Sequence, residues 1–263
     1  LKKKIKNLKN FDWISHYPLL NSATKKYKYS YSKKFLKKYK KKKLFRIIGM
    51  GGSSLGARAI YNFLKLKIKK KFIFIDNLKP LLDTKKNSVN IVISKSGETL
   101  ETFLNFRLFK KQESNIFITE KKNSLIFNEA QKLKENILEH KNYIGGRYSV
   151  LSEVGMLPAE LMGLNEKNFK NFNELIKNEN FMRNIIKNVE NILHFSSKKI
   201  YNSVILNYDE KSYYFFRWYQ QLVSESLGKK SKGIIPIISS MPQDNHSMLQ
   251  MYLDGPRKNF YTF

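Results

Sequence analysis

The stretch LFRIIGMGGSSLGARAIYNFLKLK, residues 44–67, decides the fold class of this chain. It opens as an apolar run typical of a buried strand, turns through glycines and serines, and continues with the spacing of an amphipathic helix. The same unit recurs at residues 89–111 and 115–134, and a further apolar strand is predicted at residues 72–76. Short strands that alternate with helices predict a parallel sheet covered by helices on both faces.

The chain is expected to divide into segments of different character. A basic leading segment, a first α/β domain, a helical bridge and a second, truncated α/β domain are expected, in that order, at residues 1–43, 44–164, 165–199 and 200–263. The sequence begins with Leu1 and ends on the strand pattern NFYTF, residues 259–263. We therefore expect a fragment of a longer protein whose second sheet lacks strands.

Composition narrows the class of protein. The 263 residues are 41% hydrophobic and include no Cys, so we expect a globular chain without disulfides or thiolate metal sites. The histidines are scattered and no carboxylate cluster has ligand spacing, so we expect neither a metal nor an organic cofactor. No apolar run reaches the roughly 18 to 20 residues that a membrane span needs, and the start lacks the apolar core of a signal peptide. We expect a cytoplasmic protein with no membrane partner.

The formal charge of +29 raises the question of a nucleic-acid partner. Nearly all of this charge comes from Lys, with Arg at only seven positions, whereas recognition of bases and phosphates favours the bidentate Arg fork. The densest run, KKFLKKYKKKK at residues 33–43, is more typical of a solvated helix face. We therefore expect no nucleic-acid partner, although a positive field would attract an anionic substrate.

Polar turns follow two of the predicted strands, at the sheet edge where α/β proteins bind ligands. The turn GMGGSSLG, residues 49–56, lacks the lysine of a P-loop, and its glycine spacing differs from the dinucleotide fingerprint. Asp76 would still match that fingerprint's acidic residue, so a nucleotide stays open as an alternative ligand. The turn SKSGET, residues 94–99, would cap a helix in its simplest interpretation, but hydroxyls and free N–H groups at a helix start also bind phosphate. The two turns together favour a small phosphorylated ligand.

Five motifs, in order, resemble the glucose-6-phosphate isomerases, also called phosphoglucose isomerases, of the compact bacterial type. They are GMGGSSLGARA, ISKSGETLET, GGRYSVLSEVG, WYQQLVSESLGK and QDNHSMLQMYLDGP. The resemblance runs from about Arg46 to Pro256. It implies two sugar isomerase domains, each with a flavodoxin-like parallel sheet, and a homodimer. The implied activity is the interconversion of D-glucose 6-phosphate and D-fructose 6-phosphate through an enediolate, in glycolysis and gluconeogenesis.

The resemblance also implies which residues bind the sugar phosphate. By motif match these are Gly51, Gly52, Ser53, Ser94, Lys95, Ser96 and Thr99, where the two glycines let the backbone approach the ligand. Glu98 stands where family members often carry a hydroxyl. Because a carboxylate would be repelled by a phosphate, we expect Glu98 to point away from it.

Three further residues match the catalytic positions of the family. Glu225 matches the base, Arg147 the cation that stabilises the enediolate, and His246 the ring-opening acid and base, which the resemblance assigns to the neighbouring subunit. Taken alone, each side chain has a plainer explanation: an exposed Glu at a helix end, a structural loop Arg, and a His that caps a helix or belongs to the core. The other histidines, His16, His140 and His194, match no motif and are expected to be structural.

Two features of the sequence limit this assignment. Residues 112–115, QESN, imitate the base motif of longer family members, but they precede GGRYS and are rejected. The family's ring-opening lysine near the C-terminus has no counterpart here, which leaves open whether this chain alone is active.

Other functions stay open on the sequence alone. A related enzyme acting on an amino sugar or mannose phosphate would share these motifs. A sugar-phosphate sensor should lack the pair of Glu225 and His246. A nucleic-acid binder should show steep salt dependence and no competition by sugar phosphates.

Overall fold

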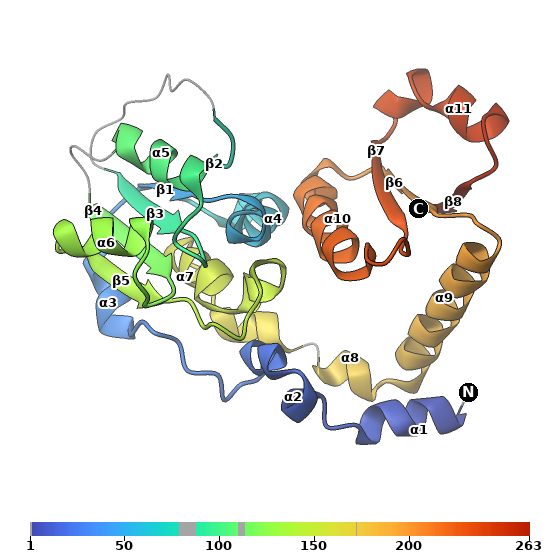
Figure 1. Ribbon diagram of the computed structural model, residues 1–263, viewed down its shortest axis with the longest axis horizontal. Helices are drawn as coiled ribbons and strands as arrows, with labels where there is room; N and C mark the ends of the chain where they lie inside the picture. Colours follow the sequence, from blue (N-terminus) through green and yellow to red (C-terminus); the bar gives the residue numbers. More distant parts are fainter. Residues whose placement is uncertain (1, 79–87, 110–113, 172) are drawn as a thin grey trace.

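The computed structural model describes residues 2–78, 88–109, 114–171 and 173–263, and Figure 1 shows their arrangement around two sheets. The first sheet has strand order β2-β1-β3-β4-β5 and the second has order β7-β6-β8. Their strands are β1 Leu44–Ile48, β2 Lys71–Ile75, β3 Val89–Ile93, β4 Ser114–Thr119, β5 Asn136–Glu139, β6 Asn202–Asn207, β7 Ile235–Ser240 and β8 Asn259–Thr262. Every strand pairing in both sheets is parallel. The predicted α/β class is confirmed.

Helices follow the strands as the alternating pattern predicts. The α-helices are α1 Lys2–Asn10, α2 Trp13–His16, α3 Lys33–Lys38, α4 Leu55–Phe63, α5 Leu100–Phe109, α6 Leu125–Lys132, α7 Glu153–Leu161, α8 Asn173–Lys177, α9 Glu179–Ser197, α10 Tyr213–Leu227 and α11 Leu249–Asp254. Short 3₁₀ helices that matter for the site are η2 Gly51–Ser53, η5 Gly146–Leu151 and η8 Gln243–His246. No helix in the described ranges combines the length and apolar character that crossing a bilayer requires.

The first sheet is covered on both faces. Successive residues of a strand point to opposite faces, so Ile47 packs in one core with α4 and α7, while Ile48 packs in a second core with α5 and α6. The central strand β3 is buried at every residue, which explains its continuous apolar sequence. The strand order 2-1-3-4-5 is flavodoxin-like, and its direction of winding reverses between β1 and β3.

The second sheet approaches the first through helix packing. Helix α10 packs against α4 of the first sheet and against β7 of its own sheet, and both helices lie between the sheets in Figure 1. At the end of α9, Phe195 stacks on Phe260 of β8 with ring centroids 5.1 Å apart. Helix α10 is therefore the element through which residues of the second half reach the first sheet.

The leading basic segment is attached to the first sheet. The Tyr27 hydroxyl donates to one Glu153 oxygen at 2.7 Å, and the backbone N–H of Ser30 donates to the other at 2.8 Å. Lys170, which is buried, donates to the carbonyl oxygen of Thr24 at 3.2 Å. These contacts join residues on either side of the expected boundaries at residues 44 and 165. The boundaries at residues 44, 165 and 200 stay predictions.

Candidate functional site

The two polar turns lie next to each other at the carboxyl edge of the first sheet. One follows β1 and contains η2, and the other follows β3 and leads into α5. Because β1 and β3 are hydrogen-bonded neighbours on either side of the reversal in winding, the turns flank the place where α/β sheets bind ligands. The structure thus brings together the two turns that the sequence singled out.

The turn after β3 is organised by its own hydroxyls. The Oγ of Ser94 lies 2.9 Å from the Oγ1 of Thr99 and accepts the N–H of Gly97 at 3.1 Å. Ser96 is exposed, and its Oγ accepts the N–H of Glu98 at 3.1 Å. Gly97 has φ +73°, a conformation that residues with a Cβ rarely adopt. Ser94 is therefore an internal part of the turn, while Ser96 faces solvent.

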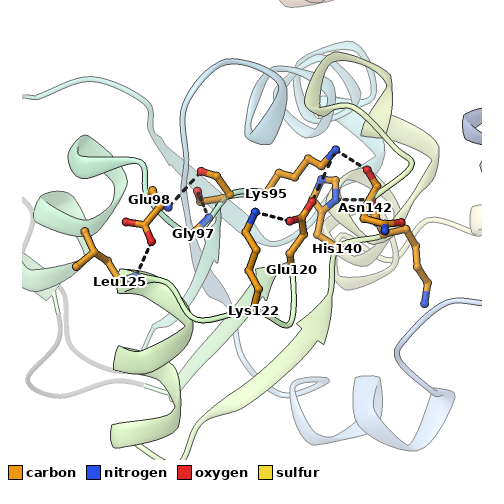
Figure 2. Close-up of polar contacts among 11 residues, drawn as sticks. Lys95, Gly97, Glu98, Glu120, Lys122, Leu125, His140 and Asn142 are labelled. Atoms are coloured by element: carbon orange, nitrogen blue, oxygen red, sulfur yellow. Dashed lines mark hydrogen bonds and ion pairs between the residues drawn. The ribbon is translucent and has the colours of Figure 1, made fainter.

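Lys95 reaches from this turn toward the neighbouring strands. Its Nζ donates to the carbonyl oxygen of Asn142 at 2.6 Å and lies 3.8 Å from Glu120, which also pairs with Lys122 at 2.7 Å. Figure 2 shows Lys95 extended toward Asn142, with Glu120 paired to Lys122 nearby. His140 lies beside them, and burial lowers its pKa to about 4. Lys95 is thus held at the edge of the turn by neighbours that no motif predicted.

Three glycines after β1 lack the Cβ that would keep four of the sequence motifs apart. A Cβ at Gly49 would lie 2.8 Å from the carbonyl oxygen of Ile93, and a Cβ at Gly51 would lie 2.7 Å from the Nε2 of Gln221. A Cβ at Gly52 would lie 2.3 Å from the carbonyl carbon of Gly146, the residue before Arg147. These approaches join the turns after β1 and β3 to η5 and to α10.

Arg147 and Glu225 form an ion pair beside this junction. The Nη1 of Arg147 lies 3.0 Å from the Oε2 of Glu225, and its Nε donates to the Oγ of Ser226 at 3.0 Å. Gln221, one helical turn before Glu225 on α10, donates to the Oε1 of Glu225 at 2.8 Å. Both carboxylate oxygens therefore have fixed donors, although the Glu225 side chain is 48% exposed.

The turn that carries Arg147 is held against α10 by its neighbours. The Tyr148 hydroxyl lies 2.7 Å from the Oγ of Ser226, and the Nε1 of Trp218 donates to the carbonyl oxygen of Arg147 at 3.2 Å. Hydrogen bonds with Tyr148 and then with Glu225 raise the pKa of Arg147. The guanidinium is therefore a permanent positive charge at this point.

His246 lies apart from this pair. It ends η8, after β7 in the second sheet, and is exposed. Asp244 anchors that turn, because its Oδ2 accepts the N–H of Ser240 at 2.7 Å and the hydroxyl of Ser239 at 2.8 Å. Within the described ranges, no hydrogen bond or ion pair joins His246 to Arg147 or Glu225. The structure places two of the three predicted catalytic residues together and leaves the third on another loop.

The remaining candidates have plain structural partners. Asp76 follows β2, and its Oδ2 forms an ion pair with the Nη1 of Arg58 at 2.5 Å. The acidic residue that would bind a nucleotide's ribose is therefore already paired with a cation. Of the rejected stretch QESN, the first two residues lie outside the described ranges, and Ser114 and Asn115 begin β4. In the portion of the chain that the structure describes, no three His, Cys, Asp or Glu side chains gather as a metal site.

Comparison with known proteins settles the family. The family model described as phosphoglucose isomerase matches residues 36–235. The chain belongs to this family. A glucose-6-phosphate isomerase of Methanocaldococcus jannaschii is 36% identical over 240 residues, covering 82% of this chain and 58% of the relative. One of Mycoplasmopsis synoviae is 32% identical, covering 98% of this chain and 67% of the relative. The predicted family is confirmed, and the chain spans little more than half of the first of these relatives.

Solved structures agree with the fold of a phosphoglucose isomerase family member. A hypothetical protein from Thermus thermophilus superimposes with a TM-score of 0.75 at 20% identity, covering 98% of this chain and 68% of that protein. The tagatose-6-phosphate ketose/aldose isomerase of Escherichia coli superimposes with a TM-score of 0.59 at 14% identity, covering 94% of this chain and 66% of that protein. At such identities the likeness supports the predicted sugar isomerase fold alone.

Several residues of this site were not predicted from the sequence. Gln221 is the clearest, because the spacing of four residues to Glu225 on a predicted helix was a usable signal. Glu120 and Asn142 carry no motif, and their contact with Lys95 depends on β4 and β5 lying beside β3. The Glu98 carboxylate is turned toward α6 (Figure 2), and its orientation relative to a bound phosphate stays a prediction.

Proposed function

We propose that the full-length protein containing this chain interconverts D-glucose 6-phosphate and D-fructose 6-phosphate. The observation that carries the proposal is the ion pair of Arg147 and Glu225 beside the two polar turns at the carboxyl edge of one sheet. The curated relatives are named glucose-6-phosphate isomerase, which supports the same reaction.

The sugar phosphate would bind at the turns after β1 and β3. The hydroxyls of Ser96 and Thr99, the ammonium of Lys95 and the hydroxyl of Ser53 would bind the phosphate oxygens. Ser94 would hold the turn in shape through its contacts with Gly97 and Thr99. Gly51 and Gly52 would let the backbone of η2 approach the ligand.

Glu225 would act as the base. Its carboxylate would remove the proton from C2 of the open-chain aldose, so that the electrons of the C–H bond form the C1–C2 double bond of the enediolate. Return of the proton to C1, together with transfer of the O2 hydroxyl proton to O1, would give the ketose. Arg147 would stabilise the negative oxygen between these steps, and Gln221 would keep the carboxylate oriented. The reaction oxidises one carbon and reduces its neighbour, so it needs no external cofactor.

His246 would open the sugar ring in a homodimer. Its exposed position at η8, away from Arg147 and Glu225 of its own chain, supports a role in the site of a neighbouring subunit. A cytoplasmic location would follow from a role in glycolysis and gluconeogenesis.

The direct test is an assay of the full-length protein with glucose 6-phosphate and fructose 6-phosphate, with mannose 6-phosphate as the control substrate. Conversion in both directions, with at most slow turnover of mannose 6-phosphate, is the expected result. Preference for mannose 6-phosphate or an amino sugar phosphate would instead favour a related isomerase.

Mixing two inactive variants tests the shared site. If His246 acts in the neighbouring subunit, hybrid dimers of Glu225→Gln and His246→Ala contain one intact site each, and an equal mixture should recover about a quarter of the parent activity. An inactive mixture that contains hybrid dimers would contradict the exchange of His246 between subunits.

A further inference from the structure

We infer that Glu98 is a positioning residue of the turn at residues 94–99, called the phosphate turn below. Glu98 fixes this turn by capping α6, the helix that follows the neighbouring strand β4. The inference rests on the proposed function, because it assigns the turn after β3 to the sugar phosphate. It concerns a residue that no catalytic motif requires and that electrostatics alone would disfavour at this place.

Glu98 connects the phosphate turn to the start of α6. The Oε1 of Glu98 accepts the backbone N–H of Leu125 at 3.3 Å, and the carbonyl oxygen of Gly97 accepts the N–H of Ile126 at 3.0 Å. Figure 2 shows the Glu98 side chain turned toward Leu125. Two consecutive residues of the turn thus accept hydrogen bonds from two consecutive residues of α6.

Helix α6 needs these acceptors because its own N-cap residue does not supply one. Ser124 occupies the N-cap position, where a side-chain oxygen usually accepts an N–H of the first turn, but it makes no capping hydrogen bond. Its Oγ is buried and lies so close to Gly97 that a Cβ there would be 2.1 Å away. Glu98 therefore takes over the capping that Ser124 does not provide.

The position of its carboxylate also explains how a negative charge is tolerated in a phosphate turn. The first turn of a helix carries partial positive charge, so a carboxylate is favourable at α6 and would be unfavourable facing a phosphate. The backbone N–H of Glu98 donates to the exposed Oγ of Ser96. Fixing Glu98 therefore also fixes a hydroxyl that we assign to the phosphate.

A turn that is fixed before the ligand arrives loses less conformational entropy on binding. The expected effect of Glu98 is therefore on affinity and not on the proton transfer at Glu225. Replacing Glu98 by Ala removes the cap and loosens the turn, whereas Gln keeps an oxygen that can accept from Leu125 and removes only the charge.

The experiment measures binding and turnover in the full-length protein. Titration calorimetry with fructose 6-phosphate gives Kd, steady-state assays give KM and kcat, and thermal unfolding gives Tm. Loss of a helix cap predicts that Glu98→Ala raises Kd and KM about three- to tenfold with kcat unchanged, while Glu98→Gln stays within about twofold of the parent. Glu101→Ala is the matched control, because Glu101 carries the same charge on the exposed first turn of α5 and should leave Kd unchanged.

Two results for Glu98→Ala would overturn the inference. A lower Kd for Glu98→Ala would mean that the carboxylate faces the phosphate, and an unchanged Kd with a lower Tm would mean that Glu98 only stabilises α6. A parent that binds fructose 6-phosphate without converting it would refute the proposed function and still test Glu98 through Kd. A parent that does not bind it would refute both.

Discussion

Gly52 offers a test of the junction between η2 and η5. A Cβ at this position would lie 2.3 Å from the carbonyl carbon of Gly146, 2.4 Å from its oxygen and 2.6 Å from the backbone nitrogen of Arg147. These are backbone atoms on a neighbouring turn, so no side-chain rotation can relieve the overlap. Gly52→Ala must therefore separate η2 from η5, which carries Arg147, by about 1 Å to reach an ordinary contact.

The size of the effect follows from this overlap. Inserting a methyl group into a packed region costs about 1 to 3 kcal/mol, and a contact with rigid backbone falls at the upper end of that range. For a chain of this length, about 3 kcal/mol corresponds to a fall in Tm of roughly 6 to 12 °C, and the fall is smaller in the longer full-length protein. A displacement of about 1 Å at a catalytic group lowers kcat/KM by roughly 10²-fold.

Gly146→Ala is the matched control, because a Cβ at Gly146 would meet nothing within 4 Å. Thermal unfolding and isomerase assays of the full-length protein should show a large loss for Gly52→Ala and parent-like values for Gly146→Ala. Equal Tm and kcat/KM for the two variants would refute the close approach of η2 and η5.

Three further predictions follow from contacts of the site. Glu225→Gln should lower kcat by at least about 10²-fold while Kd for fructose 6-phosphate changes little, and a kcat near the parent value would exclude Glu225 as the base. Arg147→Lys keeps the charge but cannot bind Ser226 and Glu225 together, so kcat should fall by about 10²-fold; unchanged kcat would remove Arg147 from the reaction. Because burial lowers the pKa of His140 to about 4 from 6.5, the unfolded chain takes up a proton that the folded chain excludes. Stability should therefore fall by up to about 3 kcal/mol as pH drops from 6.5 to 4, and denaturant unfolding of His140→Gln should show a weaker dependence than the parent.

The fold could be predicted largely because its strands are buried on both faces. Strands β1 to β4 are short apolar runs with clear turns after them, and each was expected. Strand β5, Asn136–Glu139, was missed because it is short and polar at both ends, and only Leu138 in it is fully buried. Its position beside β4 depends on tertiary packing that a local pattern does not encode.

The site was predicted in part. Motifs indicated Arg147 and Glu225, which the structure places 3.0 Å apart. They could not indicate the direction of Lys95, because its partners follow β4 and β5. They could not indicate how the Glu225 carboxylate meets η5 either, because the packing of α10 on α4 sets that approach.

The glycine junction between η2, η5 and α10 has a consequence for how the protein is made. Strands β1 to β5 end at Glu139, so the first sheet can form while the rest of the chain is still being synthesised. The pair of Arg147 and Glu225 joins residues 78 positions apart, and such distant contacts form late because the intervening chain must first be ordered. A nascent chain therefore lacks the pair of Arg147 and Glu225, and with it a complete catalytic site, until α10 has left the ribosome.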